Sequence, residues 1–177
     1  MNTLSPAGQK FVLHWGEMGT RWGINRTMAQ IHALLYLSDR PLAAEELATT
    51  LGVARSNVST SLRELQNWRI VRLVHLIGDK RDHFESLHDV WEMFRIILDE
   101  RISREVAPTR ELLEHCLTDK SKDAALDPTT RQRLQALVDF FETTSGWYAQ
   151  VSKWPQPSLV RFLRLGNKLQ KLLRLRP

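Results

Sequence analysis

The stretch from residue 42 to residue 88 constrains this chain most, because it encodes two short amphipathic helices and then a β-hairpin. Residues 42–51 predict the first helix, with acidic residues in its first turn and Gly52 after its last turn, where a left-handed cap is favourable. Residues 55–68 predict the second helix. A short turn between two such helices is typical of a helix-turn-helix, whose second helix enters a major groove.

The second predicted helix is apolar on one side and polar on the other. Its inner stripe consists of Val58, Leu62 and Leu65, which recur at helical spacing. At about 3.6 residues per turn, the opposite side carries only uncharged or basic residues, which are Ser56, Thr60, Arg63 and Asn67. A face without carboxylates is suited to lie against DNA phosphates.

A β-hairpin follows the second helix. Residues 70–77 are rich in β-branched and apolar side chains, Gly78 breaks the strand, and residues 84–87 predict its return. Lys80 and Arg81 lie between the strands, where they can contact a minor groove or phosphate groups. Winged three-helix cores also serve as protein-interaction modules, so a domain that binds a protein partner and does not read DNA is the alternative.

Eight residues are the candidate DNA contacts, six on the second helix and two on the hairpin: Arg55, Ser56, Asn57, Ser59, Thr60, Arg63, Lys80 and Arg81. An arginine can donate two hydrogen bonds to guanine or to phosphate, and an asparagine pairs with adenine in a bidentate way. Serine and threonine are short donors that let the backbone approach the DNA. The hairpin cations supply the wing contacts.

Further helices are predicted on both sides of this unit. A helix from Ser5 is expected to be interrupted at Gly19 and Gly23, and a second helix over about 25–37 supports the helix-turn-helix. After the hairpin, residues 89–118 predict a long helix that Pro108 kinks or breaks. Two more helices complete the chain, and the last of them is basic.

The flanking helices carry more apolar surface than so small a module can bury alone. The expected fold is therefore mainly α with a small β-hairpin, a winged helix-turn-helix with long flanking dimerisation helices. Residues 1–22 are the N-terminal dimerisation helix, residues 23–88 the DNA-binding domain, and residues 89–177 the C-terminal helical region for dimerisation and a candidate effector. A homodimer presents two winged modules to two half-sites of double-stranded DNA.

Charge and composition limit the other functions. The net charge is +5, but residues 21–88 hold nine Lys and Arg against seven acids, whereas residues 155–177 hold six and none. This mild local excess fits a protein that reads DNA sequence better than one that coats DNA. No apolar run reaches the ~18–20 residues of a membrane span and no signal peptide is recognisable, so we expect a cytoplasmic protein with no membrane partner.

Catalysis and metal binding have no support in the sequence. It contains no phosphate loop of the G-x-x-x-x-G-K type, no G-x-G-x-x-G and no H-E-x-x-H. The lone Cys116 has only His115 beside it, which is too small a ligand set for a metal. We therefore expect no enzyme activity, no cofactor and no metal.

Two segments resemble the MarR superfamily of bacterial regulators. They are Gly52-Val53-Ala54-Arg55-Ser56-Asn57-Val58-Ser59-Thr60-Ser61-Leu62-Arg63-Glu64-Leu65 and Gly78-Asp79-Lys80-Arg81-Asp82-His83-Phe84. The segment Trp15-Gly16-Glu17-Met18-Gly19 and the wing are more similar to the GbsR branch, named for repression of glycine-betaine synthesis. The resemblance covers about residues 10–100. It implies a cytoplasmic homodimeric repressor on a pseudo-palindromic operator, with the six helix residues at the groove and Arg81 at the wing tip.

Two positions depart from the pattern of the MarR superfamily. Ala54 stands where a serine or threonine cap is usual, so the second helix is expected to lack a side-chain cap. Arg69 stands where glycine is typical before the first wing strand, so we expect that turn to have a different shape.

Six tryptophans are many for 177 residues. Aromatic rings can enclose a quaternary ammonium effector by cation–π attraction, which the GbsR resemblance makes worth testing. The candidate cage residues are Trp15, Trp22, Trp91, Trp147 and Tyr148. The alternative is that these rings only pack in the core and the dimer interface.

The last helix, over about 159–175, is amphipathic and strongly basic. Its cations are Arg161, Arg164, Lys168, Lys171, Arg174 and Arg176. It can lie on an anionic membrane, or it can support the dimer while its basic face lies near DNA or an acidic partner region. We favour the second interpretation.

Overall fold

The structure is a computed structural model that describes residues 4–119 and 126–172. Its elements, in chain order, are α1 (Pro6–Arg21), α2 (Arg26–Leu37), β1 (Leu42–Ala43), α3 (Ala44–Leu51), α4 (Arg55–Asn67), β2 (Val71–Val74), β3 (His83–Ser86), α5 (Val90–Arg101), the π-helical turn η1 (Ile102–Val106), α6 (Ala107–Thr118), α7 (Pro128–Val151) and α8 (Gln156–Leu172). The chain divides into two compact units, residues 1–97 and residues 98–177.

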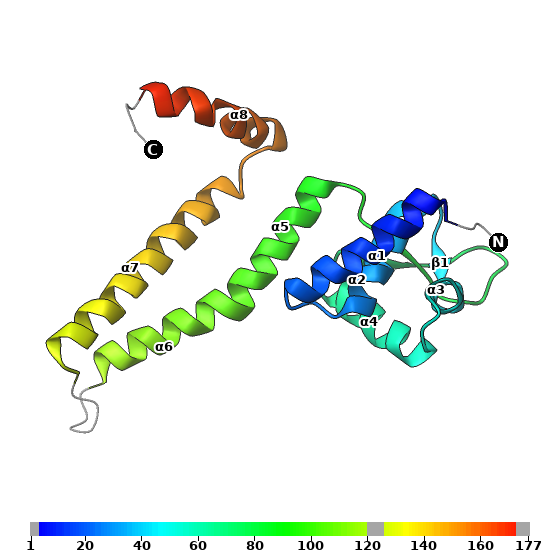
Figure 1. The fold of residues 1–177 in the computed structure, drawn as a ribbon, viewed down its shortest axis with the longest axis horizontal. Coiled ribbons are helices and arrows are strands. Elements are labelled where there is room, and N and C mark those ends of the chain that lie inside the picture. Colours follow the sequence, from blue (N-terminus) through cyan, green and yellow to red (C-terminus); the bar gives the residue numbers. More distant parts are fainter. Residues whose placement is uncertain (1–3, 120–125, 173–177) are drawn as a thin grey trace. The chain divides into compact units, whose positions relative to one another are not determined.

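Helix α2 is the centre of the first unit. Its N-terminus is capped by Asn25, whose side-chain oxygen accepts hydrogen bonds from the backbone N–H groups of Thr27 at 2.9 Å and Met28 at 3.2 Å. Every residue from Met28 to Leu35 is buried, because α1 and α4 both pack against this helix (Figure 1).

Two glycines allow α1 to approach α2 closely. A Cβ atom at Gly16 would lie 2.6 Å from Cγ of Gln30, and one at Gly19 would lie 2.6 Å from Cβ of Ala29. The expected interruption at Gly19 is wrong, since α1 continues to Arg21, but the helix does end before Gly23, which adopts φ +76°. Close packing between the helices offsets the low helix propensity of glycine, which costs about 1 kcal/mol relative to alanine in a helix interior.

The sheet is antiparallel and has the strand order β1–β3–β2. Phe84 of β3 lies opposite Leu42 of β1 and Leu73 of β2. The helix expected over residues 42–51 therefore begins at Ala44, because the two preceding residues pair with β3. The first wing strand, β2, is also shorter than expected at four residues, whereas β3 has the expected four residues and begins one residue earlier than expected.

The core of the first unit is continuous from α1 to the start of α5. Its most completely buried apolar side chains come from α2, α3, α4 and the turn before β2; they are Ile31, Leu35, Leu47, Val58, Leu65 and Ile70. The apolar stripe predicted for the second helix is confirmed, because all three of its residues are buried.

The second unit contains far less buried apolar surface. Its buried apolar residues, among those described, are Val138, Val151 and Leu159. Helices α6 and α7 pack against each other, and Arg131 of α7 donates a hydrogen bond to the backbone oxygen of Leu117 at 3.1 Å.

The expected disturbance at Pro108 takes the form of a widened turn. Helix α5 passes into the π-helical turn η1, and Pro108 lies in the first turn of α6 directly after it. Proline has no N–H group to donate, so a first-turn position is where it fits a helix. None of the helices among the described residues is long and apolar enough to cross a membrane.

Candidate nucleic-acid interface

Helices α3 and α4 and the turn between them form the candidate interface. Gly52 ends α3 in the left-handed conformation with φ +64°, and its N–H group donates to the backbone oxygen of Ala48. This conformation suits glycine because a Cβ atom would clash with the backbone. The chain then reverses over three residues and α4 begins at Arg55.

All six candidate residues on α4 are exposed: Arg55, Ser56, Asn57, Ser59, Thr60 and Arg63. The opposite side is buried, including Ser61, which the apolar pattern did not mark. No ion pair of Arg63 is formed within the described part of the chain. The structure thus gives α4 an exposed polar face, and contact of that face with DNA stays a prediction.

One residue on this face is already paired. The Arg55 guanidinium forms an ion pair with the Glu45 carboxylate in the first turn of α3. Sequence reasoning missed this pair because the partners are ten residues apart and meet only when the turn at Gly52 closes. A phosphate that binds Arg55 must compete with this carboxylate.

The expected lack of a side-chain cap on α4 is confirmed. Ala54 offers no side-chain hydrogen bond, and only its backbone oxygen accepts, from the N–H groups of Asn57 at 3.0 Å and Val58 at 3.2 Å. This leaves the N–H groups of Arg55 and Ser56, at the start of the helix, for water or an anion such as a phosphate oxygen.

The expectation that Arg69 gives the turn before the wing a different shape is wrong. Arg69 adopts φ +58°, the conformation that glycine favours, so the turn keeps the shape that a glycine would give it. Its N–H group donates to the oxygen of Gln66 at 2.8 Å, and that of Ile70 donates to Leu65 at 3.2 Å. The buried neighbours Trp68 and Ile70 hold the arginine in this strained state.

Both candidate residues of the wing, Lys80 and Arg81, are exposed in the loop between β2 and β3. Arg81 is held by Asp79: its Nε lies 3.0 Å from Oδ1, its Nη2 lies 2.6 Å from Oδ2, and its backbone N–H donates to Oδ1 at 3.0 Å. Hydrogen bonds from Arg81 hold the pKa of the Asp79 carboxyl well below its usual range. The guanidinium is therefore fixed in direction, which sequence spacing alone did not show.

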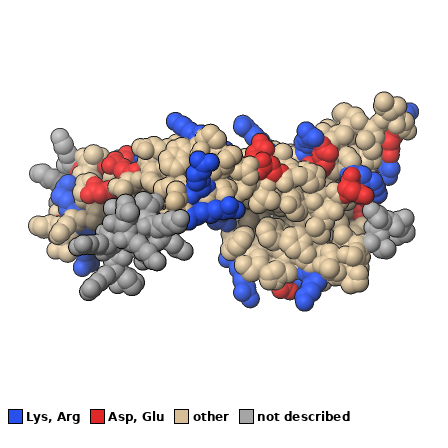
Figure 2. All heavy atoms as spheres, turned by 90° about the horizontal axis from the view of Figure 1, so that it is seen from above, with Lys and Arg blue, Asp and Glu red and all other residues tan. Residues whose placement is uncertain are grey.

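A second arginine of the wing was missed by sequence reasoning. Arg72 on β2 forms an ion pair with Glu85, which lies opposite it on β3. Strand alternation would have placed the two on one face only if the register of the hairpin had been known. Figure 2 shows one face of the molecule, on which the described basic and acidic side chains are interspersed.

The geometry described above agrees with comparisons to known proteins. Residues 22–82 match the sequence model of the MarR family. Residues 22–82 are thus similar to a MarR family domain. This segment spans α2, α3, α4 and the wing up to residue 82, so it includes all eight candidate DNA contacts.

Relatives that match most of the chain are named as HTH-type transcriptional regulators. Over 161 residues, 86% of this chain and 88% of the relative, it is 20% identical to the putative HTH-type transcriptional regulator YvaV of Bacillus subtilis (strain 168). Over 130 residues, 72% of each protein, it is 22% identical to the HTH-type transcriptional repressor GbsR of the same organism. The resemblance to the MarR superfamily and its GbsR branch is confirmed.

A solved structure titled as a crystal structure of a transcriptional regulator has the same fold. Its TM-score is 0.67 at 22% identity, and the match covers 90% of this chain and 99% of that one. The expected fold class, mainly α with a small β-hairpin in a winged helix-turn-helix, is confirmed.

The candidate cage residues are divided between the two units. In the first unit, Trp15 and Trp22 meet edge to face with ring centroids 6.2 Å apart, and Trp91 lies at the start of α5. Trp147 and Tyr148 lie on α7, where the Tyr148 hydroxyl donates to the Asp99 carboxylate at 2.9 Å. Within the first unit, the described ring contact between cage candidates is that of Trp15 with Trp22.

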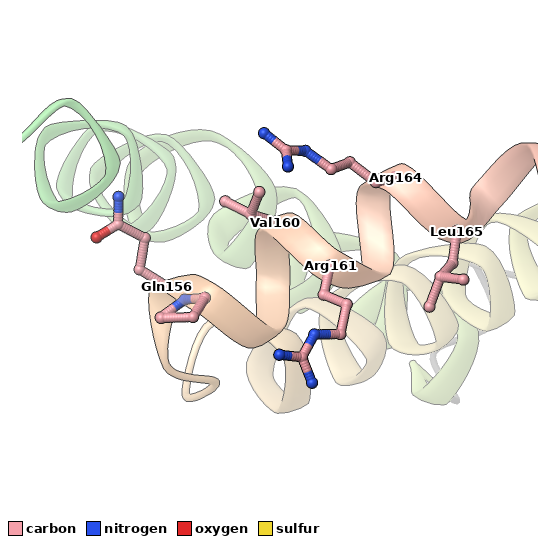
Figure 3. Close-up of a pocket in the computed structure, with 6 residues that line it drawn as sticks. Gln156, Val160, Arg161, Arg164 and Leu165 are labelled. Carbon is pink, nitrogen blue, oxygen red and sulfur yellow. The ribbon is translucent and has the colours of Figure 1, made fainter.

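A groove of about 640 Å³ on α8 is lined by Gln156, Pro157, Val160, Arg161, Arg164 and Leu165. Figure 3 shows the guanidinium groups of Arg161 and Arg164 pointing to different sides of the helix, so they do not converge on one ligand. The side chains of Lys168 and Lys171 and the positions of Arg174 and Arg176 lie outside the described residues. Both interpretations of this basic helix stay predictions.

The described residues contain no cluster of three or more His, Cys, Asp or Glu side chains that would hold a metal. Cys116 is a free, partly buried thiol on α6. The described part of the chain therefore adds no metal centre to the candidate interface.

Proposed function

We propose that this protein is a sequence-specific DNA-binding transcriptional regulator, a repressor that acts as a cytoplasmic homodimer on a pseudo-palindromic operator. The observation that carries the proposal is the α4 face, on which all six candidate residues are exposed while the other side is buried in the core. A helix supported in this way can enter the major groove with its N-terminal turns. The names of the Bacillus relatives, a regulator and a repressor, support the same function.

The wing supports the proposal independently. Its cations, Lys80 and Arg81, are exposed on the hairpin that follows the recognition helix. Because Asp79 fixes the Arg81 guanidinium, little conformational entropy is lost when this side chain meets a phosphate or a minor groove. The two elements together give base contacts and phosphate contacts in one unit.

The test is a binding titration on DNA from upstream of the protein's own reading frame. Arg63→Ala is expected to weaken specific binding by ~1–3 kcal/mol, and Arg81→Ala to reduce the salt dependence by about one counterion. Arg133→Ala, at an exposed position on α7, is the matched control and should bind like the wild type. Unchanged affinity in both interface variants defeats the proposal and favours the protein-interaction module.

An effector site for a quaternary ammonium is proposed at the tryptophans. The edge-to-face pair of Trp15 and Trp22, the second of which is half exposed, supplies two walls of such a cage. Tryptophan fluorescence titrated with choline or betaine tests it, with Trp22→Leu as the variant that should lose the response. If the fluorescence of the wild-type protein shows no saturable change, these rings serve only in packing.

A further inference from the structure

We propose that Ile77, at the tip of the wing, is an apolar wedge that enters the DNA minor groove beside the recognition helix. The proposal rests on the proposed function and adds a contact of a different kind from the eight polar residues. Ile77 is 108% exposed, so nothing in the described part of the chain covers it. The neighbouring loop residue Leu76 is 38% exposed.

The loop holds this isoleucine at its apex. The N–H group of Asp79 donates to the backbone oxygen of Leu76 at 3.2 Å, which closes a four-residue turn with Ile77 in its second position. Gly78 occupies the third position with φ +84°, the backbone geometry of a type II turn. Ile77 therefore lies at the corner of this turn, where its side chain is fully exposed.

The base of the loop is fixed by a buried histidine. His83, at the start of β3, is 2% exposed; its Nδ1 lies 2.9 Å from the oxygen of Arg81 and its Nε2 lies 3.5 Å from Oδ2 of Asp79. Asp79 in turn holds the Arg81 guanidinium and its backbone N–H group. The apex is therefore presented on an ordered loop, so inserting it into DNA costs little further ordering.

The position of Ile77 on the wing of the proposed DNA-binding unit favours DNA over a protein as its partner. Lys80 follows three residues later and is exposed. Arg81 and Arg72 are exposed as well, but they are paired with Asp79 and Glu85, so a phosphate must compete with these carboxylates. Lys80 is therefore the cation of the loop that can meet a phosphate row beside the narrow minor groove. Isoleucine is one of the side chains that proteins insert between base steps there, and the insertion unstacks the step and bends the duplex.

The experiment uses the full-length protein and the DNA fragment that the wild type selects upstream of its own reading frame. The fragment carries 2-aminopurine at adenines of its A·T steps, and its bend is measured by circular permutation. The variants are Ile77→Ala, which removes the wedge, Ile77→Leu, which keeps it, and Leu76→Ala, which removes the apolar neighbour. Because Ile77 touches no core residue, equal thermal unfolding of all four proteins is the folding control.

Ile77→Ala is expected to bind ~10-fold more weakly with an unchanged salt slope, because it loses apolar contact and no charge. It should also bend the DNA less and lose the 2-aminopurine fluorescence increase, while Ile77→Leu and Leu76→Ala keep both. Wild-type bending retained by Ile77→Ala overturns the wedge but leaves the proposed function intact. A change in the association state of DNA-free Ile77→Ala, with bending retained, also overturns it and assigns the tip to a protein contact. Failure of the wild type to bind any DNA fragment specifically removes the proposed function itself.

Discussion

The two units of this chain bury their apolar side chains to very different extents. In the first unit, residues from α1, α2, α3, α4, the wing and the start of α5 share one core. In the second unit, α6, α7 and α8 leave large apolar side chains exposed, namely Leu112, Leu137, Phe140, Trp147, Leu163 and Leu165. The first unit can be stable through its own packing, whereas the second lacks a comparable core within the single chain.

The exposed residues of α7 follow a regular pattern. Leu137, Phe140 and Trp147 are three and seven residues apart, so they lie along one side of the helix. An exposed apolar stripe of this length marks an interaction surface. This supports the proposed homodimer, in which a second copy supplies the cover that the unit lacks.

The largest effect on stability is expected in the core of the first unit. Leu65→Ala removes a side chain that is 1% exposed and should lower the free energy of unfolding by about 3 kcal/mol. Leu112→Ala, at a position that is 62% exposed on α6, is the matched variant and should cost below about 0.5 kcal/mol. Chemical denaturation measures both. Equal costs would mean that the second unit also buries its leucines, and the contrast would disappear.

The second unit should respond to a change that prevents burial by a partner. Phe140→Glu places a charge in the exposed stripe of α7 and should weaken the homodimer at least ~100-fold, since an unpaired charge cannot be buried cheaply. Sedimentation measures the dissociation constant. Gln135→Glu adds the same charge roughly 140° around the helix and should leave the dimer intact. Dimers of equal strength in both variants would place the interface elsewhere.

Acid sensitivity should reside in the first unit. His32 on α2 is buried with its Nε2 3.1 Å from Sδ of Met93 on α5, and burial lowers its pKa to about 4. As the pH falls below the ordinary histidine pKa near 6.5, His32 becomes protonated in the unfolded chain but stays neutral in the folded protein. Stability is thus complete above about pH 6.5 and decreases by about 2 kcal/mol between pH 7 and pH 5.

The pH dependence is measured by thermal unfolding at a series of pH values. His32→Leu should lose this part of the pH dependence while it keeps a buried apolar side chain in α2. A variant with the same acid sensitivity as the wild type would assign the effect to another group.

The smallest effect is a gain in stability at the turn before the wing. Arg69→Gly should stabilise the protein by about 1 kcal/mol, because glycine adopts φ +58° without strain. Arg69→Ala removes the same charge but keeps the strain, so it should gain nothing. Melting temperatures of the two variants separate the causes; equal values would attribute the change to the lost charge.

Much of the first unit could be predicted from the sequence because its signals are local. The spacing of Val58, Leu62 and Leu65 placed the inner side of α4, and Gly52 marked the end of α3. The exposed candidate residues of α4 followed from the same spacing. Resemblance to the MarR superfamily rested on these segments, and the family match confirms it.

Other features depended on partners that are distant in the sequence. The continuation of α1 through Gly19 depends on Ala29 of α2, and the shortened α3 depends on pairing of β1 with β3. The Arg55–Glu45 ion pair needs the turn between α3 and α4. Helix propensity depends on residues that are close in the sequence, so it could not predict these contacts.

The sequence alone determined which helices and strands form in the winged unit and which side of α4 is polar. Both follow from hydrophobic periodicity and from glycines that end elements, and these signals act over a few residues. Tertiary structure decided which cations are held, how the wing presents Ile77, and that Arg69 accepts a glycine-like conformation. These properties depend on contacts that exist only after the core has closed. The packing energy that many residues share can then outweigh the conformational preference of any single residue.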